Sequence, residues 1–313
     1  MSKPEILLAG AYPEWDMVDL EAKYVVHKLY EAADRDAFVR EIGGNIRAIA
    51  TRGELGASAE LMTSLPKLEV VSVYGVGTDA VNLAHARENG IRVTNTPDVL
   101  SDDVADLAIG LLLSAARLIP RGDAIVRSGQ WGKAAMPLVT RVSGKRVGVV
   151  GMGRIGQAIA RRAAGFDCDI RYFSRNAHTQ VSYQYEPDLL KLADWTEFLI
   201  VIVPGGDATK NIINTEVLKA LGPDGILVNV SRGSTVDEEA LIGALQTRTI
   251  KAAGLDVFHN EPNIDERFFA LDNAVLQPHH GSGTVETRKA MGQLVRDNLA
   301  AHFAGQPLPT PVV

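Results

Sequence analysis

The chain has 313 residues, 46% of them apolar and 22% charged, which is the composition of a globular protein with room for two domains. Its net charge of −6 argues against nucleic acid or an anionic membrane surface as a main partner. The single cysteine, Cys168, excludes an internal disulfide framework and a metal site built from several cysteines, and no apolar run is long enough to span a membrane, so we expect a soluble protein of a reducing cytoplasm.

The first third of the chain alternates between short apolar strands and helices. We predict helices over 18–40, 57–65 and 80–89, and strands in the segments EILLAG, IRAIA, LEVVSVYG and IRVTN. Short apolar strands separated by helices are typical of a parallel sheet that is covered on both faces.

A long apolar segment, SDDVADLAIGLLLSAARLI, follows this series. It offers Ser101 as a helix N-cap and two aspartates for the positive end of the helix dipole. From Val104 onward it is apolar on nearly every side, which a surface helix would not tolerate. We therefore expect this helix to be buried between domains or subunits.

A second series of strands and helices follows. Strands are predicted in KRVGVVGMG, DIRYFSR, EFLIVIVP, GILVNVS, IKAAGLDVF and NAVLQPHH, with helices between them and a last helix over about 284–303. This is the pattern of a doubly wound parallel sheet that binds nucleotides. The predicted fold class is α/β.

A glycine-rich turn lies between the first strand and the first helix of this second series. Gly151, Gly153 and Gly156 have the G-x-G-x-x-G spacing and directly follow the strand RVGVV. The first glycine permits a tight turn, the second lets the backbone approach a pyrophosphate, and the third lets the helix pack closely on the sheet. The helix N-terminus supplies amides for the phosphates, so the motif predicts a dinucleotide site.

The position that normally holds a ribose-binding carboxylate carries Ser174, followed by Arg175. A carboxylate there accepts hydrogen bonds from the ribose hydroxyls of NAD and repels a 2′-phosphate, whereas a hydroxyl and a guanidinium favour the phosphate. Asp167 and Asp169 lie at the opposite end of this strand and do not replace the carboxylate. We predict NADP(H) as the cofactor, with NAD(H) as the weaker alternative.

Three later segments carry polar residues where strands end: NVSRGSTVDE, GLDVFHNEP and LQPHHGSGT. Together with TNTPDVLSDDVADLAIGLLL, GKRVGVVGMGRIG and PHHGSGTVETR, they occur in the order typical of the D-2-hydroxyacid dehydrogenase family, which the sequence resembles over nearly the whole chain. Within that family, FDCDIRYFSR and GSGTVETRKAM look most like the NADPH-dependent glyoxylate/hydroxypyruvate reductases and the hydroxyphenylpyruvate reductases.

The resemblance implies a catalytic set of Arg232, Glu261 and His279. Arg232 would bind the carboxylate of a 2-oxo acid, His279 would protonate the ketone oxygen, and Glu261 would favour the charged imidazole. His280 is the competing histidine. We choose His279 because it follows Pro278 as in the family motif, and because adjacent strand residues point to opposite faces. No metal site is expected, and His259 receives no role.

The same resemblance implies the rest of the binding site. Val76 and Gly77 would hold the substrate carboxylate through their amides, with a plain glycine turn as the alternative there. The implied cofactor set contains the three glycines, Ser174, Arg175 and His279. It also contains six further residues: Arg154, Ile155, Val203, Pro204, Val230 and Asp256. Four residues are candidates for the side-chain pocket of the substrate: Tyr74, Trp131, Met136 and Leu138.

The family topology implies two domains with two doubly wound parallel sheets. A flavodoxin-like substrate domain would comprise 1–96 and 286–313, and a Rossmann cofactor domain would comprise 97–285, with the substrate in a cleft that closes between them. The apolar helix of 101–119 would form a homodimer contact.

The implied function is NADPH-dependent reduction of glyoxylate or hydroxypyruvate, small 2-oxo acids, to D-2-hydroxy acids by hydride transfer. Reduction of an aryl-pyruvate such as hydroxyphenylpyruvate is one alternative. A nucleotide-sensing protein without enzymatic activity, similar to the corepressors of this family, is another.

Overall fold

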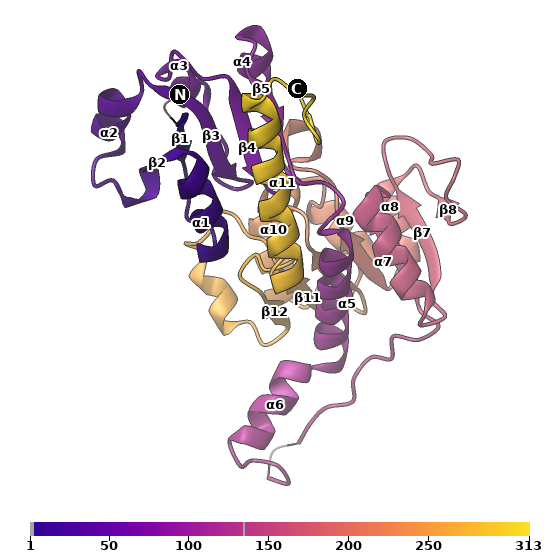
Figure 1. The fold of residues 1–313 in the computed structure, drawn as a ribbon. Helices are drawn as coiled ribbons and strands as arrows, with labels where there is room; N and C mark the ends of the chain where they lie inside the picture. The colour runs from indigo at the N-terminus through magenta and orange to yellow at the C-terminus, as the bar shows by residue number, and fades with distance from the viewer. Residues whose placement is uncertain (1–2, 134) are drawn as a thin grey trace. The chain divides into compact units, whose positions relative to one another are not determined.

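The computed structural model describes residues 3–133 and 135–313. The chain divides into two compact units, one made of 1–100 with 283–313 and the other made of 101–282 (Figure 1). The sequence-based expectation places the two boundaries after residues 96 and 285. Each unit has its own parallel sheet with helices on both faces, which confirms the predicted α/β class.

The first unit is built on a five-stranded parallel sheet in the order β2-β1-β3-β4-β5, the flavodoxin-like arrangement. Its strands are β1 (Glu5–Leu8), β2 (Val25–Lys28), β3 (Ile46–Arg52), β4 (Val70–Tyr74) and β5 (Arg92–Thr94). Its helices are α1 (Glu14–Lys23), α2 (Arg35–Ile42), α3 (Ala59–Thr63), α4 (Leu83–Glu88) and α11 (Val285–Phe303).

The single helix predicted over 18–40 is wrong. The segment forms α1, the edge strand β2, a short 3-10 turn (Leu29–Glu31) and α2. Tyr24 ends α1 in an extended conformation, and Val25 then pairs with Glu5 of β1. Two consecutive β-branched valines favour a strand at this point, and the prediction of a helix did not take them into account.

Side-chain contacts join the C-terminal helix α11 to the rest of the first unit. The hydroxyl of Tyr74 at the end of β4 donates to the carbonyl oxygen of Arg288 in α11. Arg296 of α11 forms a buried ion pair with Asp16 of α1. Burial raises the pKa of Asp16, against the opposing effect of Arg296. Tyr74 is itself buried, so its ring packs inside this unit.

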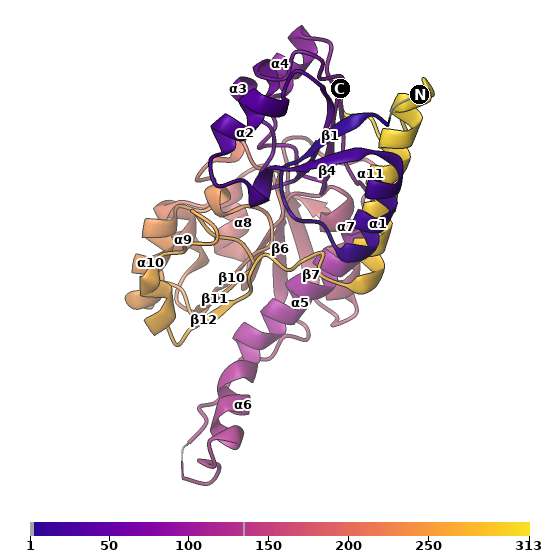
Figure 2. The ribbon, with the colours of Figure 1, turned by 60° about the vertical axis from the view of Figure 1, so that its left-hand side comes forward.

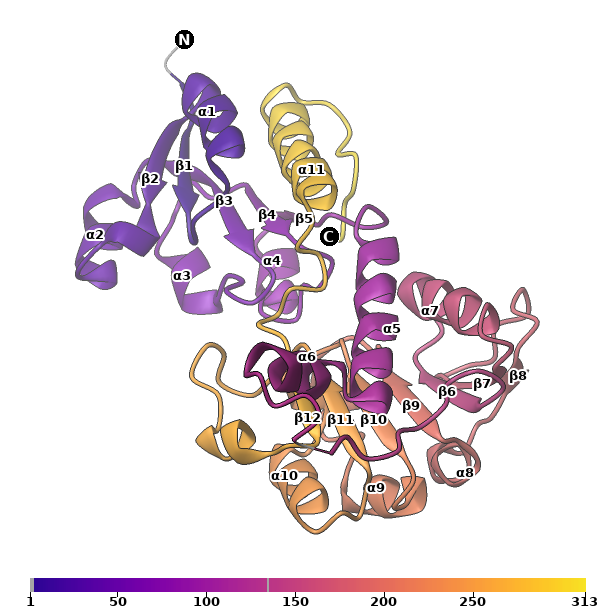
Figure 3. The ribbon, with the colours of Figure 1, turned by 90° about the horizontal axis from the view of Figure 1, so that it is seen from below.

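The second unit is built on a seven-stranded parallel sheet in the order β12-β11-β10-β9-β6-β7-β8. Its strands are β6 (Arg146–Val150), β7 (Asp169–Phe173), β8 (Gln184–Tyr185), β9 (Phe198–Val201), β10 (Ile226–Asn229), β11 (Ala252–Leu255) and β12 (Ala274–Leu276). Its helices are α5 (Ser101–Arg117), α6 (Ile119–Arg127), α7 (Arg154–Ala164), α8 (Leu189–Trp195), α9 (Thr215–Leu221) and α10 (Glu238–Gln246). Figure 3 shows α5 and α7 on one face of this sheet and α8, α9 and α10 on the other. The sequence reading missed the two-residue strand β8.

Helix α5 is buried within its own unit, and its expected contact with another subunit stays a prediction. Eight of its side chains are buried, and the helix packs against α7, β10 and β11. Ser101 is its first helical residue, where the sequence suggested an N-cap. The following helix α6 has no buried residue, and Figure 2 shows it extending away from the sheet. The exposed apolar surface of this region therefore begins where α5 ends.

Within the parts of the chain that the structure describes, no helix is long and apolar enough to cross a bilayer. Over the same residues, no group of three or more His, Cys, Asp or Glu side chains is arranged to hold a metal ion.

Candidate active site

The residues expected to carry the chemistry follow neighbouring strands of the second unit at one edge of its sheet. Arg232 comes three residues after the end of β10, Asp256 directly follows β11, and His279 comes three residues after β12. Because these strands are parallel and adjacent, their carboxyl ends meet at the same edge. Open α/β sheets bind their ligands at this edge.

His279 and Glu261 form a direct pair in this site. The Nδ1 atom of His279 lies 2.7 Å from Oε2 of Glu261, and the other carboxylate oxygen accepts the backbone N–H of Phe258 at 2.8 Å. Burial raises the pKa of Glu261, but His279, the Phe258 amide and the charge of Arg232 together bring this pKa below its usual value. The structure thus places an ionised carboxylate on one ring nitrogen of His279. The other nitrogen is left for a second partner.

The backbone of His279 is held in an uncommon conformation by Asp256. His279 has φ +52°, in the left-handed region that costs most side chains roughly 1–2 kcal/mol. The buried carboxylate of Asp256 accepts the next two amides, those of His280 at 2.7 Å and Gly281 at 2.8 Å. Burial raises the pKa of Asp256, and these two amides and His279 oppose that shift.

This geometry corrects the argument used to choose between the two histidines. Neither His279 nor His280 lies in a strand, since β12 ends at Leu276, so alternation along a strand does not separate them. What separates them is the turn held by Asp256: His279 contacts Glu261, while the residue His280 is exposed. The sequence did not predict that Asp256 binds this turn.

Arg232 lies in a turn that is fixed by buried polar side chains. Asn229 donates to the carbonyl oxygen of Arg232 at 3.1 Å and accepts both the amide and the hydroxyl of Ser231. The hydroxyl of Thr235 donates to the same Arg232 carbonyl at 2.7 Å. The guanidinium itself donates to the Ser231 carbonyl oxygen. Asn229 and Thr235 were missed by sequence reasoning, although both lie within the motif that identified Arg232.

The glycine-rich turn has the geometry that its spacing predicts. Gly151 has φ +106°, and a Cβ there would lie 2.5 Å from the carbonyl oxygen of Ile202. A Cβ on Gly156 would lie 2.0 Å from the Gly151 carbonyl oxygen, so α7 packs against the turn. By contrast, a Cβ on Gly153 would meet no atom within 4 Å, so the space in front of this N-cap residue is open. An open glycine at a helix N-terminus fits the pyrophosphate of a dinucleotide.

Ser174 and Arg175 directly follow β7, at the same edge of the sheet. The Ser174 hydroxyl donates to the carbonyl oxygen of Asn176 at 2.6 Å, and the hydroxyl of Tyr185 in β8 donates to the Ser174 carbonyl oxygen at 3.2 Å. Arg175 is exposed. The Ser174 hydroxyl therefore shapes the loop, and Arg175 is the group in it that offers charge.

The other expected binding residues follow strands or begin a helix. Val203 and Pro204 follow β9, Val230 follows β10, and Arg154 and Ile155 begin α7. In the first unit, Val76 and Gly77 follow β4, where the side-chain amide of Asn95 donates to the Val76 carbonyl oxygen at 2.8 Å. Of the pocket candidates in the second unit, Trp131 is 81% exposed, Met136 41% and Leu138 102%.

Comparisons with known proteins bear on the family of the chain. Residues 109–281 match the family described as D-isomer specific 2-hydroxyacid dehydrogenase, NAD binding domain. The chain is 50% identical over 296 residues to a hydroxyphenylpyruvate reductase from Plectranthus scutellarioides, covering 94% of each chain. It is 46% identical over 312 residues to a 2-ketogluconate reductase from Gluconobacter oxydans, covering 100% of this chain and 99% of the relative.

Among solved structures, an NADPH-dependent glyoxylate/hydroxypyruvate reductase from Sinorhizobium meliloti, in complex with NADP and malonate, matches with a TM-score of 0.91. Its sequence is 42% identical, and the match covers 100% of this chain and 97% of that one. The resemblance inferred from the sequence motifs is thereby confirmed: the chain belongs to the D-isomer specific 2-hydroxyacid dehydrogenase family of oxidoreductases.

Proposed function

We propose that this protein reduces small 2-oxo acids of the glyoxylate and hydroxypyruvate class to D-2-hydroxy acids with NADPH. The observation that carries the proposal is the His279–Glu261 pair, 2.7 Å apart, at the sheet edge that also holds Arg232 and the open glycine turn. The Sinorhizobium meliloti reductase was solved in complex with malonate, a small carboxylic acid, which supports a substrate of this class.

Each residue of the set has a distinct task in this proposal. The guanidinium of Arg232 binds the substrate carboxylate and polarises the adjacent ketone through charge-assisted hydrogen bonds. The Nε2–H of the charged His279 ring donates the proton that the ketone oxygen takes up on reduction. Glu261 holds Nδ1 and stabilises the ring's positive charge before that transfer. The reduced nicotinamide, when bound, supplies the hydride to the keto carbon.

The cofactor would be held by the glycine turn and the loop after β7. Gly151, Gly153 and Gly156, with Arg154 and Ile155, would bind the pyrophosphate at the start of α7. Ser174 and Arg175 form the loop that would receive the 2′-phosphate, with Arg175 providing the charge. The NADPH dependence of the Sinorhizobium meliloti relative supports this assignment. Val203, Pro204, Val230 and Asp256 would contact the remainder of the cofactor, and Val76 and Gly77 would bind the substrate carboxylate.

We also infer a homodimer, and we place its contact at the end of the expected 101–119 helix region and in the segment that follows. Helix α5 uses its apolar side chains within its own unit. The exposed large apolar side chains lie beyond it: Ile119, Val126, Trp131, Met136, Leu138 and Val139. Such a gathering is typical of a surface that another protein covers. A reducing cytoplasm stays a prediction from the single cysteine.

A panel of 2-oxo acids with each cofactor tests the function. Glyoxylate, hydroxypyruvate, pyruvate, phenylpyruvate, hydroxyphenylpyruvate and 2-ketogluconate are assayed with NADPH and with NADH. We expect the highest kcat/KM for glyoxylate or hydroxypyruvate with NADPH. A clear preference for hydroxyphenylpyruvate would identify an aryl-pyruvate reductase, the function of the Plectranthus relative. Tight NADPH binding without turnover of any substrate would favour the nucleotide sensor.

A further inference from the structure

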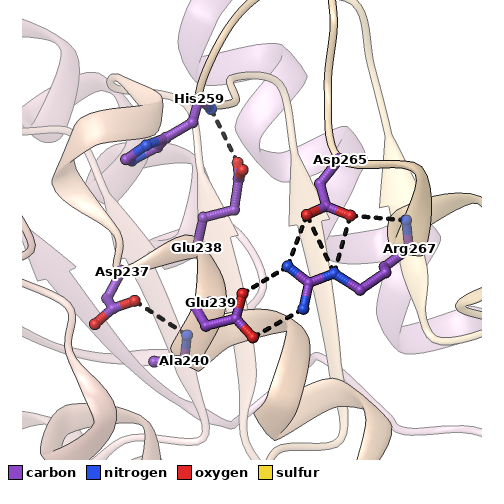
Figure 4. A network of polar contacts seen from close by, with 7 residues as sticks. All are labelled: Asp237, Glu238, Glu239, Ala240, His259, Asp265 and Arg267. Atoms are coloured by element: carbon purple, nitrogen blue, oxygen red, sulfur yellow. Dashed lines mark hydrogen bonds and ion pairs between the residues drawn. The ribbon is translucent and has the colours of Figure 1, made fainter.

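The segment that carries Glu261 is attached to helix α10 by a carboxylate that the proposed reaction does not use. The backbone amide of His259 donates to Oε2 of Glu238 at 2.9 Å (Figure 4). Glu238 is the first residue of α10, next to the N-cap Asp237, whose side chain accepts the amide of Ala240. Glu238 is half-buried, whereas its neighbour Glu239 is exposed and binds Arg267.

The two peptide bonds that flank Phe258 are both held in place. The Phe258 amide donates to Glu261, and the His259 amide donates to Glu238. A Cβ on Gly233 would lie 2.1 Å from the carbonyl carbon and oxygen of Phe258, so the turn containing Arg232 packs directly on the 258–259 peptide. The peptide is thus the point at which the Arg232 turn and the Glu261 segment meet.

We propose that Glu238 is a positioning residue for the Glu261–His279 pair. By accepting the His259 amide, Glu238 fixes the 258–259 peptide against Gly233, and this peptide adjoins the 257–258 peptide, whose Phe258 amide donates to Glu261. Two hydrogen bonds, one on each of the peptides that flank Phe258, therefore connect the start of α10 to the carboxylate on His279. The inference rests on the proposed function for the roles of Glu261 and His279.

Four variants separate the effect of the hydrogen bond that Glu238 accepts from the effect of its negative charge. Glu238→Ala removes the acceptor, Glu238→Asp keeps the charge but withdraws the oxygens by one methylene, and Glu238→Gln keeps an acceptor oxygen without the charge. Glu239→Ala is the matched control, because it removes an adjacent carboxylate of the same helix that binds only the exposed Arg267 and not the 256–261 segment. Glu238→Asp also serves if the alanine variant does not fold, since aspartate is favourable in the first helical turn.

In steady-state reduction, we expect Glu238→Ala and Glu238→Asp to lower kcat about tenfold, the equivalent of one lost hydrogen bond, with little change in the KM for NADPH. Glu238→Gln restores kcat to within about threefold of wild type. Glu239→Ala keeps wild-type kcat. Equal impairment of Glu238→Ala and Glu238→Gln, or wild-type kcat in Glu238→Ala and Glu238→Asp, would overturn the proposal.

A second measurement does not depend on turnover. The pKa of Glu261 can be followed by NMR of protein with selectively 13C-labelled glutamate. The charged groups that act on Glu261 are His279, Arg232 and Asp256. If Glu238 no longer holds the segment in place, the hydrogen bonds of Glu261 with Phe258 and His279 weaken, and the effect of burial dominates. The pKa of Glu261 therefore rises in Glu238→Ala and Glu238→Asp but not in Glu238→Gln.

Removing a nearby negative charge alone would lower the pKa of Glu261, in Glu238→Gln as much as in Glu238→Ala, and that result contradicts positioning. If the wild-type protein reduces none of the 2-oxo acids, yet the pKa of Glu261 rises as expected, the proposed function fails while the positioning role stands.

Discussion

The Nδ1 atom of His279 lies 2.7 Å from Oε2 of Glu261, and this carboxylate has a pKa below its usual value although it is more than half buried. A buried carboxylate without partners would have a raised pKa. The lowered value therefore reflects the hydrogen bonds and positive charges gathered around it. The carboxylate is therefore ionised where it contacts Nδ1 of His279, and it holds the ring in a fixed orientation.

Glu261→Gln should reduce activity in a pH-dependent way. The amide keeps the shape of the side chain but loses the charge that stabilises a protonated ring, so the alkaline fall of kcat for reduction should move to lower pH. At neutral pH we expect kcat to be at least about tenfold lower. Rate profiles of both proteins across the pH range check this, and superimposable profiles would contradict it.

The same carboxylate should contribute to stability in a defined pH window. Because the pKa of Glu261 is lower in the folded protein than in the unfolded chain, its contribution is complete above the unfolded value of about 4.3. It is lost as the pH falls through the lowered folded pKa. Thermal unfolding should therefore show a larger difference between wild type and Glu261→Gln at neutral pH than at strongly acid pH. A difference that grows on acidification would contradict the lowered pKa.

Arg232→Lys should impair substrate binding and leave the cofactor site intact. Lysine keeps the charge but lacks the planar fork that binds a carboxylate through two hydrogen bonds. We expect kcat/KM for glyoxylate to fall about 10- to 100-fold, the equivalent of one charge-assisted hydrogen bond, with an unchanged Kd for NADPH. A large loss of NADPH affinity would place Arg232 in the wrong part of the site.

The double variant Ser174→Asp with Arg175→Ala should reverse the cofactor preference. A carboxylate accepts the ribose hydroxyls of NAD and repels the 2′-phosphate, so the ratio of kcat/KM values for NADPH over NADH should fall at least about 100-fold. Ser174→Ala alone is the control. Because the Ser174 hydroxyl already donates to Asn176, its removal should change the ratio by no more than about threefold. An unchanged ratio in the double variant would exclude this loop from cofactor selection.

Alanine at two glycines of the same turn should have different effects. Gly153→Ala adds a methyl group to open space at φ −71°, so we expect a wild-type melting temperature and weaker NADPH binding. Gly156→Ala places a methyl group against the Gly151 carbonyl oxygen, which should cost about 1–3 kcal/mol of stability in addition to affinity. Calorimetry of both proteins, with and without NADPH, separates the effects. Equal melting temperatures would contradict the packing argument.

Leu138→Asp, alone or with Trp131→Ser, should weaken the inferred dimer. Both side chains are exposed within the chain, and a charge in an apolar contact is costly to bury. Sedimentation velocity should show a shift toward monomer. Val18→Asp is a matched control, because Val18 is also an exposed apolar residue (65%) but lies in α1 of the first unit. Dissociation by the control, or a dimer unaffected by Leu138→Asp, would place the interface elsewhere.

The sequence predicted local structure correctly where a motif is compatible with only one backbone conformation. The spacing of Gly151, Gly153 and Gly156 predicted the turn, because a side chain at the first or third position would collide with the backbone and one at the second would fill the open space before α7. The prediction of one helix over 18–40 failed because the segment contains a strand of only four residues, Val25–Lys28. A strand this short has too little alternation of polar and apolar residues to be distinguished from part of a helix. The two residues of β8 carry almost no pattern at all.

The contacts that support the site were the least predictable part. Asn229, Glu238 and the turn-binding role of Asp256 act through backbone amides and carbonyls, and a backbone group leaves no signature in the sequence at the position it occupies. Helix α5 shows a related limit: an apolar segment predicts burial, but only the packing against α7 and β11 shows which surface covers it.

The central claim is that His279 donates the proton during reduction, and single-turnover NADPH oxidation by wild type and His279→Asn across the pH range tests it most directly. We predict a wild-type rate that falls on the alkaline side, and a variant rate that is at least about 100-fold lower and does not fall there. A variant that keeps the wild-type rate, or that shows the same alkaline fall, would contradict the account.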